Sequence, residues 1–298
     1  MTSIAITGVS GYLGGYVADL CRQQGAAVVP LLRRPEDHSN APQFDLRKSA
    51  IKAGTFRERG VRTLIHCGYD FQPRRAEDIW SINVEGTRRL FTEAREGGVE
   101  RLILISSLSA YDGTRSLYGM AKLEQEKLVC ALGGVCLRPG LIWSETPHGM
   151  VGTLMSFVRK LPVVPLIGGG EHQQFLIHID DLSRIIFCLS EGPWKYGGEI
   201  LPVAYPQSKS LRQILEIIAA KNNKKPIFIP VPWRMAYFAV KIAEIIVPNI
   251  KIRSDSIMGL IYSCVNPNLN VELLERLAGS PLTPFEYSSS SHFHEDEK

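Results

Sequence analysis

The stretch SIAITGVSGYLGGYVADLCRQQG, residues 3–25, decides the fold class of this chain. An apolar run is followed at once by Gly8, Gly11 and Gly14 and then by an amphipathic segment. Glycines at this spacing let the backbone turn tightly and come close to a pyrophosphate, while the free N–H groups of the following helix attract phosphate. This strand–turn–helix therefore predicts the start of a dinucleotide-binding βαβ unit.

Short β-rich runs alternate with amphipathic segments through the first two-thirds of the chain. The runs that predict strands are residues 3–7, 26–32, 61–66, 101–106 and 134–140, and the segments that predict helices are residues 12–24, 79–96 and 117–131. Strand–helix–strand spacing of this kind makes parallel units whose helices cover both faces of a sheet. We therefore predict an α/β fold, a Rossmann-type doubly wound parallel sheet with its ligand crevice beyond the carboxyl ends of the strands.

This rhythm breaks after the fifth predicted strand, where turn-rich connections and a run of helix-like segments follow. We expect a dinucleotide-binding domain formed by residues 1–144 and 171–205, and a smaller, mostly helical C-terminal substrate lobe formed by 145–170 and 206–287. The polar, low-complexity tail 288–298 is expected to be disordered.

The composition is that of an ordinary globular protein: 298 residues, 45% hydrophobic and 21% charged, with a formal charge of +4. That charge is too small to argue for nucleic acid or an anionic membrane. The six cysteines form no CxxC pair, which predicts free thiols in a reducing compartment. Because the first residues already form a strand and no run approaches the roughly 18 apolar residues of a membrane span, the cytoplasm is the expected location.

The end of the second predicted strand bears on the choice of dinucleotide. An acidic residue there usually holds a ribose 2′-hydroxyl, whereas a 2′-phosphate needs cations. Here Arg33 and Arg34 follow the strand, and the first acid is Glu36. NADP is therefore favoured and NAD stays open, since the two arginines could also be solvated loop charges. Asp45 could accept a hydrogen bond from the adenine amino group.

A tyrosine and a lysine one helical turn apart supply a candidate proton relay. Tyr118 and Lys122 share one face of a predicted helix, so the ammonium can favour the phenolate and bring the tyrosine pKa down toward working pH. The helix follows a strand that ends in Ser106 and Ser107, which places a hydroxyl at the same sheet edge. This pair is therefore the candidate for proton transfer beside a nicotinamide.

The same spacing occurs twice more, at Tyr205/Lys209 and Tyr237/Lys241, so spacing alone is not specific. Tyr205 precedes a proline, which disfavours a helix at that residue. Tyr237 lies in the expected second lobe, on a stripe that packing explains better. Position therefore favours Tyr118.

Together these motifs resemble the short-chain dehydrogenase/reductase superfamily, of the extended NAD-dependent epimerase/dehydratase type or a divergent relative. TGVSGYLG, FDL, LIHCG, NVEGT, ISSLSAY, YGMAK, LRPG and IHIDD stand in the family's order and cover about residues 1–192. The resemblance implies that Ser107 hydrogen-bonds the substrate oxygen, that Tyr118 acts as acid or base, and that Lys122 holds the ribose and tunes Tyr118. Asn83 would support the site from behind, although a buried polar residue satisfied by backbone groups explains it equally well.

The resemblance also implies a cofactor groove along the glycine turn and the ends of the following strands. Its expected residues are Gly8, Ser10, Gly11, Tyr12, Leu13, Gly14, Arg33, Arg34, Asp45, Leu46, Cys67, Gly68, Tyr118 and Lys122. His148, His172 and His178 have no metal-ligand spacing, so no metal site is expected.

Three features depart from the sugar-modifying members of the family. The stretch between Ser107 and Tyr118 is shorter than usual in the sugar epimerases. Leu108 and Ser109 stand where sugar 4,6-dehydratases carry an acidic pair for water elimination, so that chemistry is not expected. Residues 138–141 lack the asparagine that nucleotide-sugar enzymes commonly place after this strand, which puts such a substrate in doubt.

The leading hypothesis is an NAD(P)-dependent oxidoreductase that interconverts a secondary alcohol and a carbonyl on a small molecule. A sugar or nucleotide-sugar epimerase that works by transient oxidation would use the same three side chains. A non-catalytic dinucleotide-binding scaffold or redox sensor is the alternative of another class. The intact Ser/Tyr/Lys set argues against it. A small-molecule substrate is the expected partner; neither nucleic acid nor a membrane is expected, and a homodimer stays open.

Overall fold

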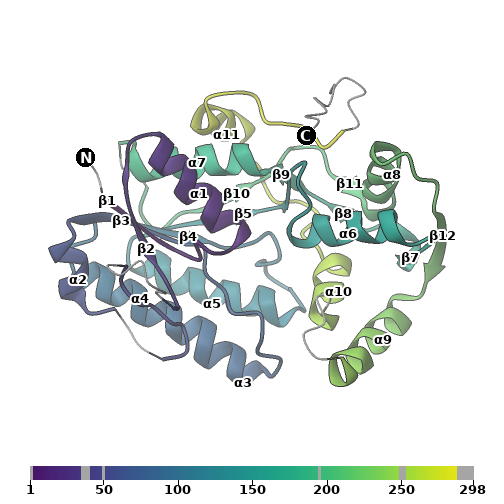
Figure 1. The fold of residues 1–298 in the computed structure, drawn as a ribbon, viewed down its shortest axis with the longest axis horizontal. Helices are drawn as coiled ribbons and strands as arrows, with labels where there is room; N and C mark the ends of the chain where they lie inside the picture. Colours follow the sequence, from purple (N-terminus) through teal and green to yellow (C-terminus); the bar gives the residue numbers. More distant parts are fainter. Residues whose placement is uncertain (1–2, 35–40, 49–50, 194–195, 248–252, 287–298) are drawn as a thin grey trace, which may run out of the picture.

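A parallel six-stranded sheet forms the centre of the first domain (Figure 1). The computed structural model describes residues 3–34, 41–48, 51–193, 196–247 and 253–286. The strands of the sheet are β1 (Ser3–Thr7), β2 (Ala27–Leu31), β3 (Val61–His66), β4 (Arg101–Ile105), β5 (Val135–Pro139) and β10 (Ile200–Val203). Their order is β10-β5-β4-β3-β1-β2, with all neighbours parallel. The order reverses between β1 and β3, which is where ligands bind in such sheets.

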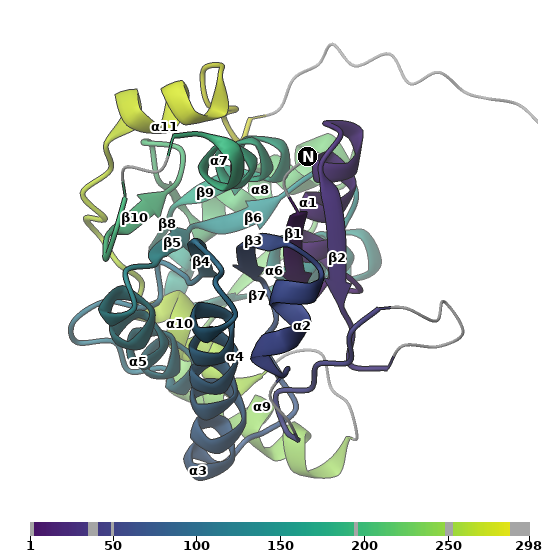
Figure 2. The ribbon, with the colours of Figure 1, turned by 90° about the vertical axis from the view of Figure 1, so that its left-hand side faces the viewer.

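Helices cover both faces of this sheet (Figures 1 and 2). One face packs against α1 (Tyr12–Gln23) and α7 (Ile179–Glu191). The other packs against α2 (Ala53–Glu58), α4 (Glu85–Glu96) and α5 (Leu117–Ala131). The predicted Rossmann-type α/β fold is confirmed.

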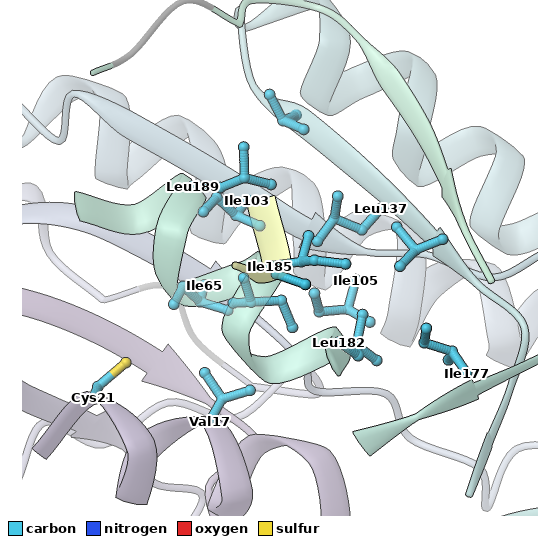
Figure 3. Packing of buried hydrophobic residues seen from close by; sticks show 14 of the residues in the cluster. Val17, Cys21, Ile65, Ile103, Ile105, Leu137, Ile177, Leu182, Ile185 and Leu189 are labelled. Atoms are coloured by element: carbon cyan, nitrogen blue, oxygen red, sulfur yellow. The ribbon is translucent and has the colours of Figure 1, made fainter. Parts of the chain in front are cut away.

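Both faces of the strands are apolar because successive side chains point to opposite sides of the sheet. Ile4 and Ile6 of β1 belong to the core under α1 and α7, whereas Ala5 belongs to the core on the opposite face. Cys21 of α1 is buried in the first core as a free thiol, and the other five cysteines are free as well. Figure 3 shows this core, in which strand residues meet one side of α1 and α7: Ile65, Ile103, Ile105, Leu137, Val17, Leu182, Ile185 and Leu189.

The five predicted strands and three predicted helices lie within a few residues of their expected bounds. The helix expected at 79–96 is a longer run, in which a π-helical segment, Trp80–Val84, separates α3 (Ala76–Ile79) from α4. The strand β10 and the helix α2 carry no clear sequence signal, because each is short and β10 contains a proline.

A second lobe faces the carboxyl ends of the strands (Figure 1). Its helices are α6 (Gly149–Lys160), α8 (Leu211–Lys221), α9 (Trp233–Ile246) and α10 (Ser254–Ile261), and β7 (Val163–Ile167) pairs in parallel with β12 (Ile227–Val231). Two short pairs lie nearby: β6 (Leu141–Trp143) with β9 (Leu176–His178), and β8 (Gln173–Gln174) with β11 (Lys209–Ser210). Helices make up most of the lobe, as predicted. Within the described ranges, no helix combines the length and apolar character that crossing a bilayer requires.

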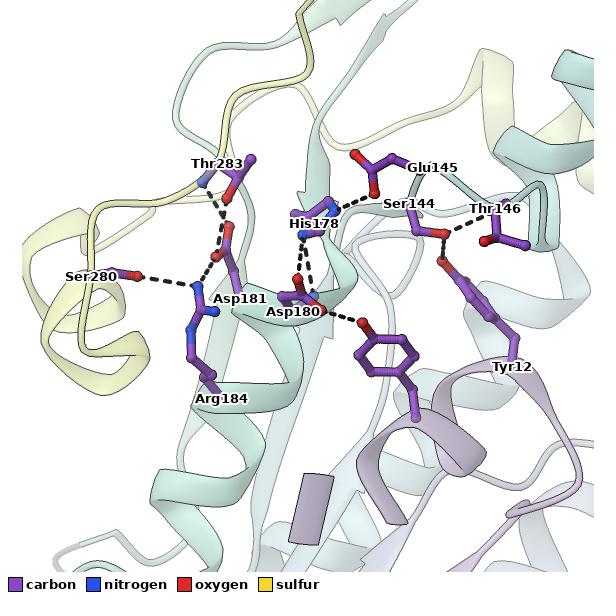
Figure 4. A network of polar contacts seen from close by, with 11 residues as sticks. Tyr12, Ser144, Glu145, Thr146, His178, Asp180, Asp181, Arg184, Ser280 and Thr283 are labelled. Carbon is purple, nitrogen blue, oxygen red and sulfur yellow. Dashed lines mark hydrogen bonds and ion pairs between the residues drawn. The ribbon is translucent and has the colours of Figure 1, made fainter. Parts of the chain in front are cut away.

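The last helix, α11 (Val271–Ala278), returns to the first domain and packs on α7. Leu274 and Ala278 join the core under the sheet. Buried Asp181 of α7 accepts a hydrogen bond from the Thr283 amide at 2.7 Å (Figure 4). This packing departs from the expected assignment of 206–287 to the second lobe alone, because the apolar pattern of a helix does not show which core it joins. The other domain bounds stay predictions, and the tail 288–298 lies outside the described residues.

Candidate active site

A cavity of about 900 Å³ lies between the carboxyl ends of the strands and the second lobe. The predicted site residues that line it come from the glycine turn, the strand ends and α5: Gly8, Ser10, Gly11, Tyr12, Leu13, Gly14, Arg33, Asp45, Leu46, Cys67, Gly68, Ser107, Tyr118 and Lys122. Arg34 and Asn83 are outside the lining. The fold thus brings the predicted nucleotide end and the predicted chemical end into one space at the point where the strand order reverses.

The glycine turn is packed so closely that side chains would not fit. Gly8 has a φ of +72°, and a Cβ on it would lie 3.0 Å from the amide nitrogen of Gly68. A Cβ on Gly14, in the first turn of α1, would lie 2.2 Å from the carbonyl oxygen of Gly8. No side chain caps α1, so the N–H groups of its first turn are left for another acceptor. The turn therefore has the form that fits a pyrophosphate.

Tyr12, the first residue of α1, ties the glycine turn to the segment that opens the second lobe. Its hydroxyl donates to Ser144 Oγ at 2.7 Å, and Ser144 donates to the carbonyl oxygen of Thr146 at 2.8 Å (Figure 4). The Tyr12 ring also stacks on His148, with centroids 4.7 Å apart. These contacts hold the nucleotide end of the cavity against the second lobe.

Acidic and basic side chains meet at the nucleotide end. Arg33 and Asp45 both line the cavity. Asp70, on the loop after β3, forms an ion pair with Arg47 at 2.7 Å. Burial raises the pKa of Asp70, but hydrogen bonds with Arg47 and the Gln72 amide and the charges of Arg47 and Arg33 outweigh it, so this pKa lies below its ordinary value. Asp70 is therefore an anion with its own cationic partner.

Ser107, Tyr118 and Lys122 converge at the chemical end. Ser107 follows β4 and forms a hydrogen bond with Tyr118 in the first turn of α5. The Ser107 oxygen also accepts a bond from the Ser109 amide at 3.1 Å. Lys122 is buried, and its Nζ donates to the carbonyl oxygen of Ile105 at 2.8 Å. The three side chains therefore line the same end of the cavity.

Ser106 serves the fold and not the relay. It donates to Glu126 of α5 at 2.5 Å, and Arg138 of β5 contacts both oxygens of the same carboxylate at 2.8 and 2.6 Å. Bidentate pairs of this kind fix orientation as well as distance. The pair therefore anchors the helix that carries Tyr118 to the sheet.

The predicted lowering of the Tyr118 pKa is wrong in this structure. Burial raises the pKa of Tyr118 to about 12, with the charge of Asp255 adding to the rise and the hydrogen bond with Ser107 opposing it. Lys122 Nζ lies 6.0 Å from the centroid of the Tyr118 ring, and burial lowers the pKa of Lys122 itself to about 8. The loss of contact with water, and not the charge of Lys122, thus sets the direction of the Tyr118 pKa shift. Tyr118 is protonated at neutral pH.

Two aromatic side chains that no sequence motif singled out surround Tyr118. The ring of Tyr69 meets it edge-on, with centroids 4.9 Å apart, and the ring of Phe71 stacks beside it at 5.7 Å. Their position just after β3 could have indicated that they line the site, because the carboxyl ends of the strands in such a sheet face the ligand. They give the chemical end an apolar wall.

The start of α10 adds two charged residues that sequence reasoning missed. Asp255 accepts hydrogen bonds from the amides of Leu117 and Tyr118 at 2.7 and 3.0 Å, at the beginning of α5. A carboxylate at a helix N-terminus satisfies free N–H groups and interacts favourably with the helix dipole. Arg253 donates to the carbonyl oxygen of Phe71 at 2.6 Å. The second lobe therefore holds both the relay helix and the aromatic wall in place.

Asn83 is fully buried in the π-helical segment. Its side chain accepts from the Asp70 amide at 2.7 Å and donates to the Asp70 carbonyl at 3.0 Å. It therefore fastens the loop that carries Tyr69 and Phe71, and backbone groups satisfy it. A catalytic role for Asn83 stays a prediction.

His66 is fully buried at the end of β3. One ring nitrogen lies 2.7 Å from Thr7 Oγ1 and the other lies 3.0 Å from Thr87 Oγ1, which also accepts from Gln125 at 2.8 Å. Burial, with a smaller effect from the charge of Lys122, lowers the pKa of His66 to about 3. The imidazole is therefore neutral in the native protein at neutral and mildly acidic pH.

This neutral histidine predicts a specific acid sensitivity. Between its unfolded pKa of about 6.5 and its native pKa of about 3, the unfolded chain binds one more proton, so stability falls as pH falls through that window. The slope is up to about 1.4 kcal/mol per pH unit. Denaturant unfolding of the wild type and of His66→Gln at pH 7 and 5.5 should therefore show a steeper loss in the wild type. Parallel losses in the two proteins would contradict this account.

The other two tyrosine–lysine pairs lie outside the cavity lining. Tyr205 follows β10 and Lys209 belongs to β11, so these two do not share a helix. Tyr237 and Lys241 share α9, with Nζ 5.5 Å from the ring centroid, but not the cavity. Their placement agrees with the positional argument for Tyr118.

A doubly wound sheet with a glycine turn under a large cavity defines a dinucleotide-binding protein of the Rossmann type. The model of the NAD dependent epimerase/dehydratase family matches residues 4–201. The chain belongs to this family.

Relatives of the chain differ in the chemistry that their names state. The ceramide reductase of Caulobacter vibrioides is 27% identical, over 62% of this chain and 60% of that protein, so the chain spans less than two thirds of its length. The UDP-glucose 4-epimerase of Vibrio cholerae is 24% identical, over 77% of this chain and 79% of that protein. The solved structure of MoeE5 in complex with UDP-glucose and NAD has a TM-score of 0.66 at 20% identity and covers 78% of this chain and 85% of that one, which shows a shared fold.

Proposed function

We propose that this enzyme interconverts a secondary alcohol and a carbonyl group on a small molecule, with NADP preferred to NAD. The observation that carries the proposal is the convergence of Ser107, Tyr118 and Lys122 on one cavity at the strand ends. Proton transfer beside a hydride donor needs a positioned acid and groups that stabilise its conjugate base. A scaffold or redox sensor has no use for such a set.

The residues at the nucleotide end fit a dinucleotide. Because Gly8 and Gly14 carry no side chains, a ligand can approach the backbone of the glycine turn closely. The uncapped N–H groups in the first turn of α1 would hold the pyrophosphate. Arg33 would contact a 2′-phosphate, Asp45 the adenine, and Lys122 the ribose next to the nicotinamide. When bound, the nicotinamide supplies or accepts the hydride.

Tyr118 acts as the acid in the reducing direction. Because its pKa of about 12 keeps the hydroxyl protonated at neutral pH, it can pass the proton to the carbonyl oxygen of the substrate. Ser107 donates a hydrogen bond to the same oxygen, and the ammonium of Lys122 stabilises the phenolate that is left. In the oxidising direction the proton moves back from the alcohol to the phenolate form of Tyr118, which the pKa of about 12 disfavours at neutral pH.

The chemical end favours a largely apolar substrate over a nucleotide sugar. Among the described residues the cavity is lined by three cations, Arg33, Lys122 and Arg253, of which only the last comes from the second lobe. Arg253 is already bonded to two backbone carbonyls. Binding a diphosphate commonly relies on free arginine or lysine donors. The relative named as a ceramide reductase supports this reading, and the relative named as a UDP-glucose 4-epimerase keeps epimerisation as the second candidate.

A cofactor balance separates these functions. The purified chain, incubated with NADPH and a panel of apolar ketones and aldehydes, should consume the cofactor in proportion to the alcohol formed. An epimerase would change the stereochemistry of a nucleotide sugar without net consumption of cofactor. Tight cofactor binding with no turnover on any substrate would support the scaffold and overturn the proposal.

The preference for NADP is tested at Arg33. A charge-assisted hydrogen bond to phosphate contributes roughly 1.5–3 kcal/mol, so Arg33→Ala should weaken NADPH binding by about one to two orders of magnitude and leave NADH almost unchanged. Arg34→Ala is the matched control, because Arg34 is exposed and outside the cavity lining. Equal losses for both cofactors in Arg33→Ala would remove the basis for the preference.

A further inference from the structure

Helix α9 presents its large apolar side chains to solvent. Met235, Phe238, Ile242, Ile245 and Ile246 are each between 57% and 81% exposed. Because they are spaced by three or four positions, with one neighbour at the end, they form a single stripe along the helix. We call these five residues the outer stripe.

The opposite side of α9 is made of smaller or more polar residues. Ala236, Val240 and Ala243 are half-buried there. Glu244 is buried, and it accepts two hydrogen bonds from Ser254 at 3.1 and 2.9 Å. This side packs on α10. A helix that only folds onto its own lobe would bury its largest aliphatic side chains, so the outer stripe indicates a second contact surface.

The charges around the outer stripe select the partner. Helix α9 carries two basic residues, Arg234 and Lys241, and one acid, the buried Glu244. Arg234 and Lys241 are exposed and, two turns apart, lie along one border of the stripe. A twofold contact with a second copy would put the same two cations on both sides and would offer them no exposed acid of α9 as a partner. An anionic bilayer instead offers opposite charge above an apolar interior.

We infer that α9 docks the protein on an anionic membrane surface, with the outer stripe at the acyl boundary and Arg234 and Lys241 at the headgroups. Figures 1 and 2 both show α9 at the lower edge of the molecule, away from the sheet. Because α10 packs on α9 and carries Asp255 in the cavity wall, docking holds this wall about one helix diameter, roughly 10 Å, from the lipid. The small net charge of the whole chain conceals this local excess of cations. The inference is independent of the reaction proposed above.

Sedimentation of the full chain with vesicles tests the docking. We expect binding to phosphatidylcholine vesicles that contain about one third phosphatidylglycerol, at least tenfold weaker binding to phosphatidylcholine alone, and weakening by added salt. Absence of binding to the mixed vesicles would overturn the inference.

Two double variants of the exposed surface and one control variant sharpen the test without touching the core. Ile242→Ser/Ile245→Ser should lose at least tenfold in vesicle affinity, whereas Val265→Ser should not, although Val265 is 78% exposed and Ile245 is 81% exposed. Arg234→Glu/Lys241→Glu should lose the preference for anionic lipid. If the chain is instead a dimer that Ile242→Ser/Ile245→Ser dissociates and neither form binds vesicles, the outer stripe belongs to a second copy and the inference fails.

Discussion

Replacing Tyr118 with Phe is expected to lower turnover by roughly 10²–10⁴-fold, the usual contribution of a positioned acid or base, while NADPH binding is retained. The ring stays in contact with Tyr69 and Phe71, and only the hydroxyl that bonds Ser107 is removed. Steady-state turnover on a verified carbonyl substrate, with cofactor affinity from a separate titration, measures the two effects independently.

The chain supplies its own controls for this substitution. Tyr205→Phe and Tyr237→Phe remove hydroxyls from the two other tyrosines that have a lysine four positions on, and both lie outside the cavity lining. Both variants should keep near-normal turnover. If Tyr118→Phe keeps it too, the proton travels by another route and the roles given to Ser107 and Lys122 must be withdrawn.

The second large effect is expected from one added methyl group at Gly14. Its Cβ would lie 2.2 Å from the carbonyl oxygen of Gly8, so Gly14→Ala must displace either the glycine turn or the start of α1. Two charge-assisted contacts to a pyrophosphate are worth roughly 1.5–3 kcal/mol each, and losing them should weaken both NADPH and NADH by about 100-fold or more. The same crowding should lower the free energy of unfolding by about 1–3 kcal/mol.

Gly54→Ala is the matched control for Gly14→Ala, because Gly54 also lies inside a helix. A Cβ at Gly54 would meet its nearest neighbour, Glu58 Oε1, at 3.7 Å, which is an ordinary contact. Cofactor affinity should be unchanged, and alanine should stabilise α2 by up to about 1 kcal/mol. Cofactor affinities of Gly14→Ala within a factor of two of the wild type would show that the turn tolerates the displacement.

The fold could be predicted where local signals were long and regular. Strands such as Arg101–Ile105 are apolar on both faces, and α1 and α4 carry clear periodicity. The short elements α2, with six residues, and β10, with four, were not predicted because a short segment carries too little pattern. The packing of α11 on α7 was not predicted either, because an amphipathic pattern shows which side of a helix is apolar but not which element that side contacts.

The candidate site could be predicted as far as residues stood in ordered motifs at strand ends. Ser107, Tyr118 and Lys122 converge on one cavity because parallel strands end at the same edge. Asp255 accepts a hydrogen bond from the amide of Leu117, which lies 138 positions earlier in the chain. A contact between residues so far apart in the sequence has no characteristic spacing from which it could be predicted. The direction of the Tyr118 pKa shift depends on burial, which helical spacing does not reveal.

The contact between Asp255 and the start of α5 limits whether the second lobe could be replaced by that of a related protein. A chain cut after residue 205 would keep the whole sheet and the serine, tyrosine and lysine. It would nevertheless lose the acceptor for the Leu117 and Tyr118 amides. The half that shapes the substrate pocket is therefore not an interchangeable attachment. A replacement lobe with a new substrate specificity must also place a carboxylate at the position of Asp255. Without it, the start of α5 and Tyr118 lose the contact that fixes their position.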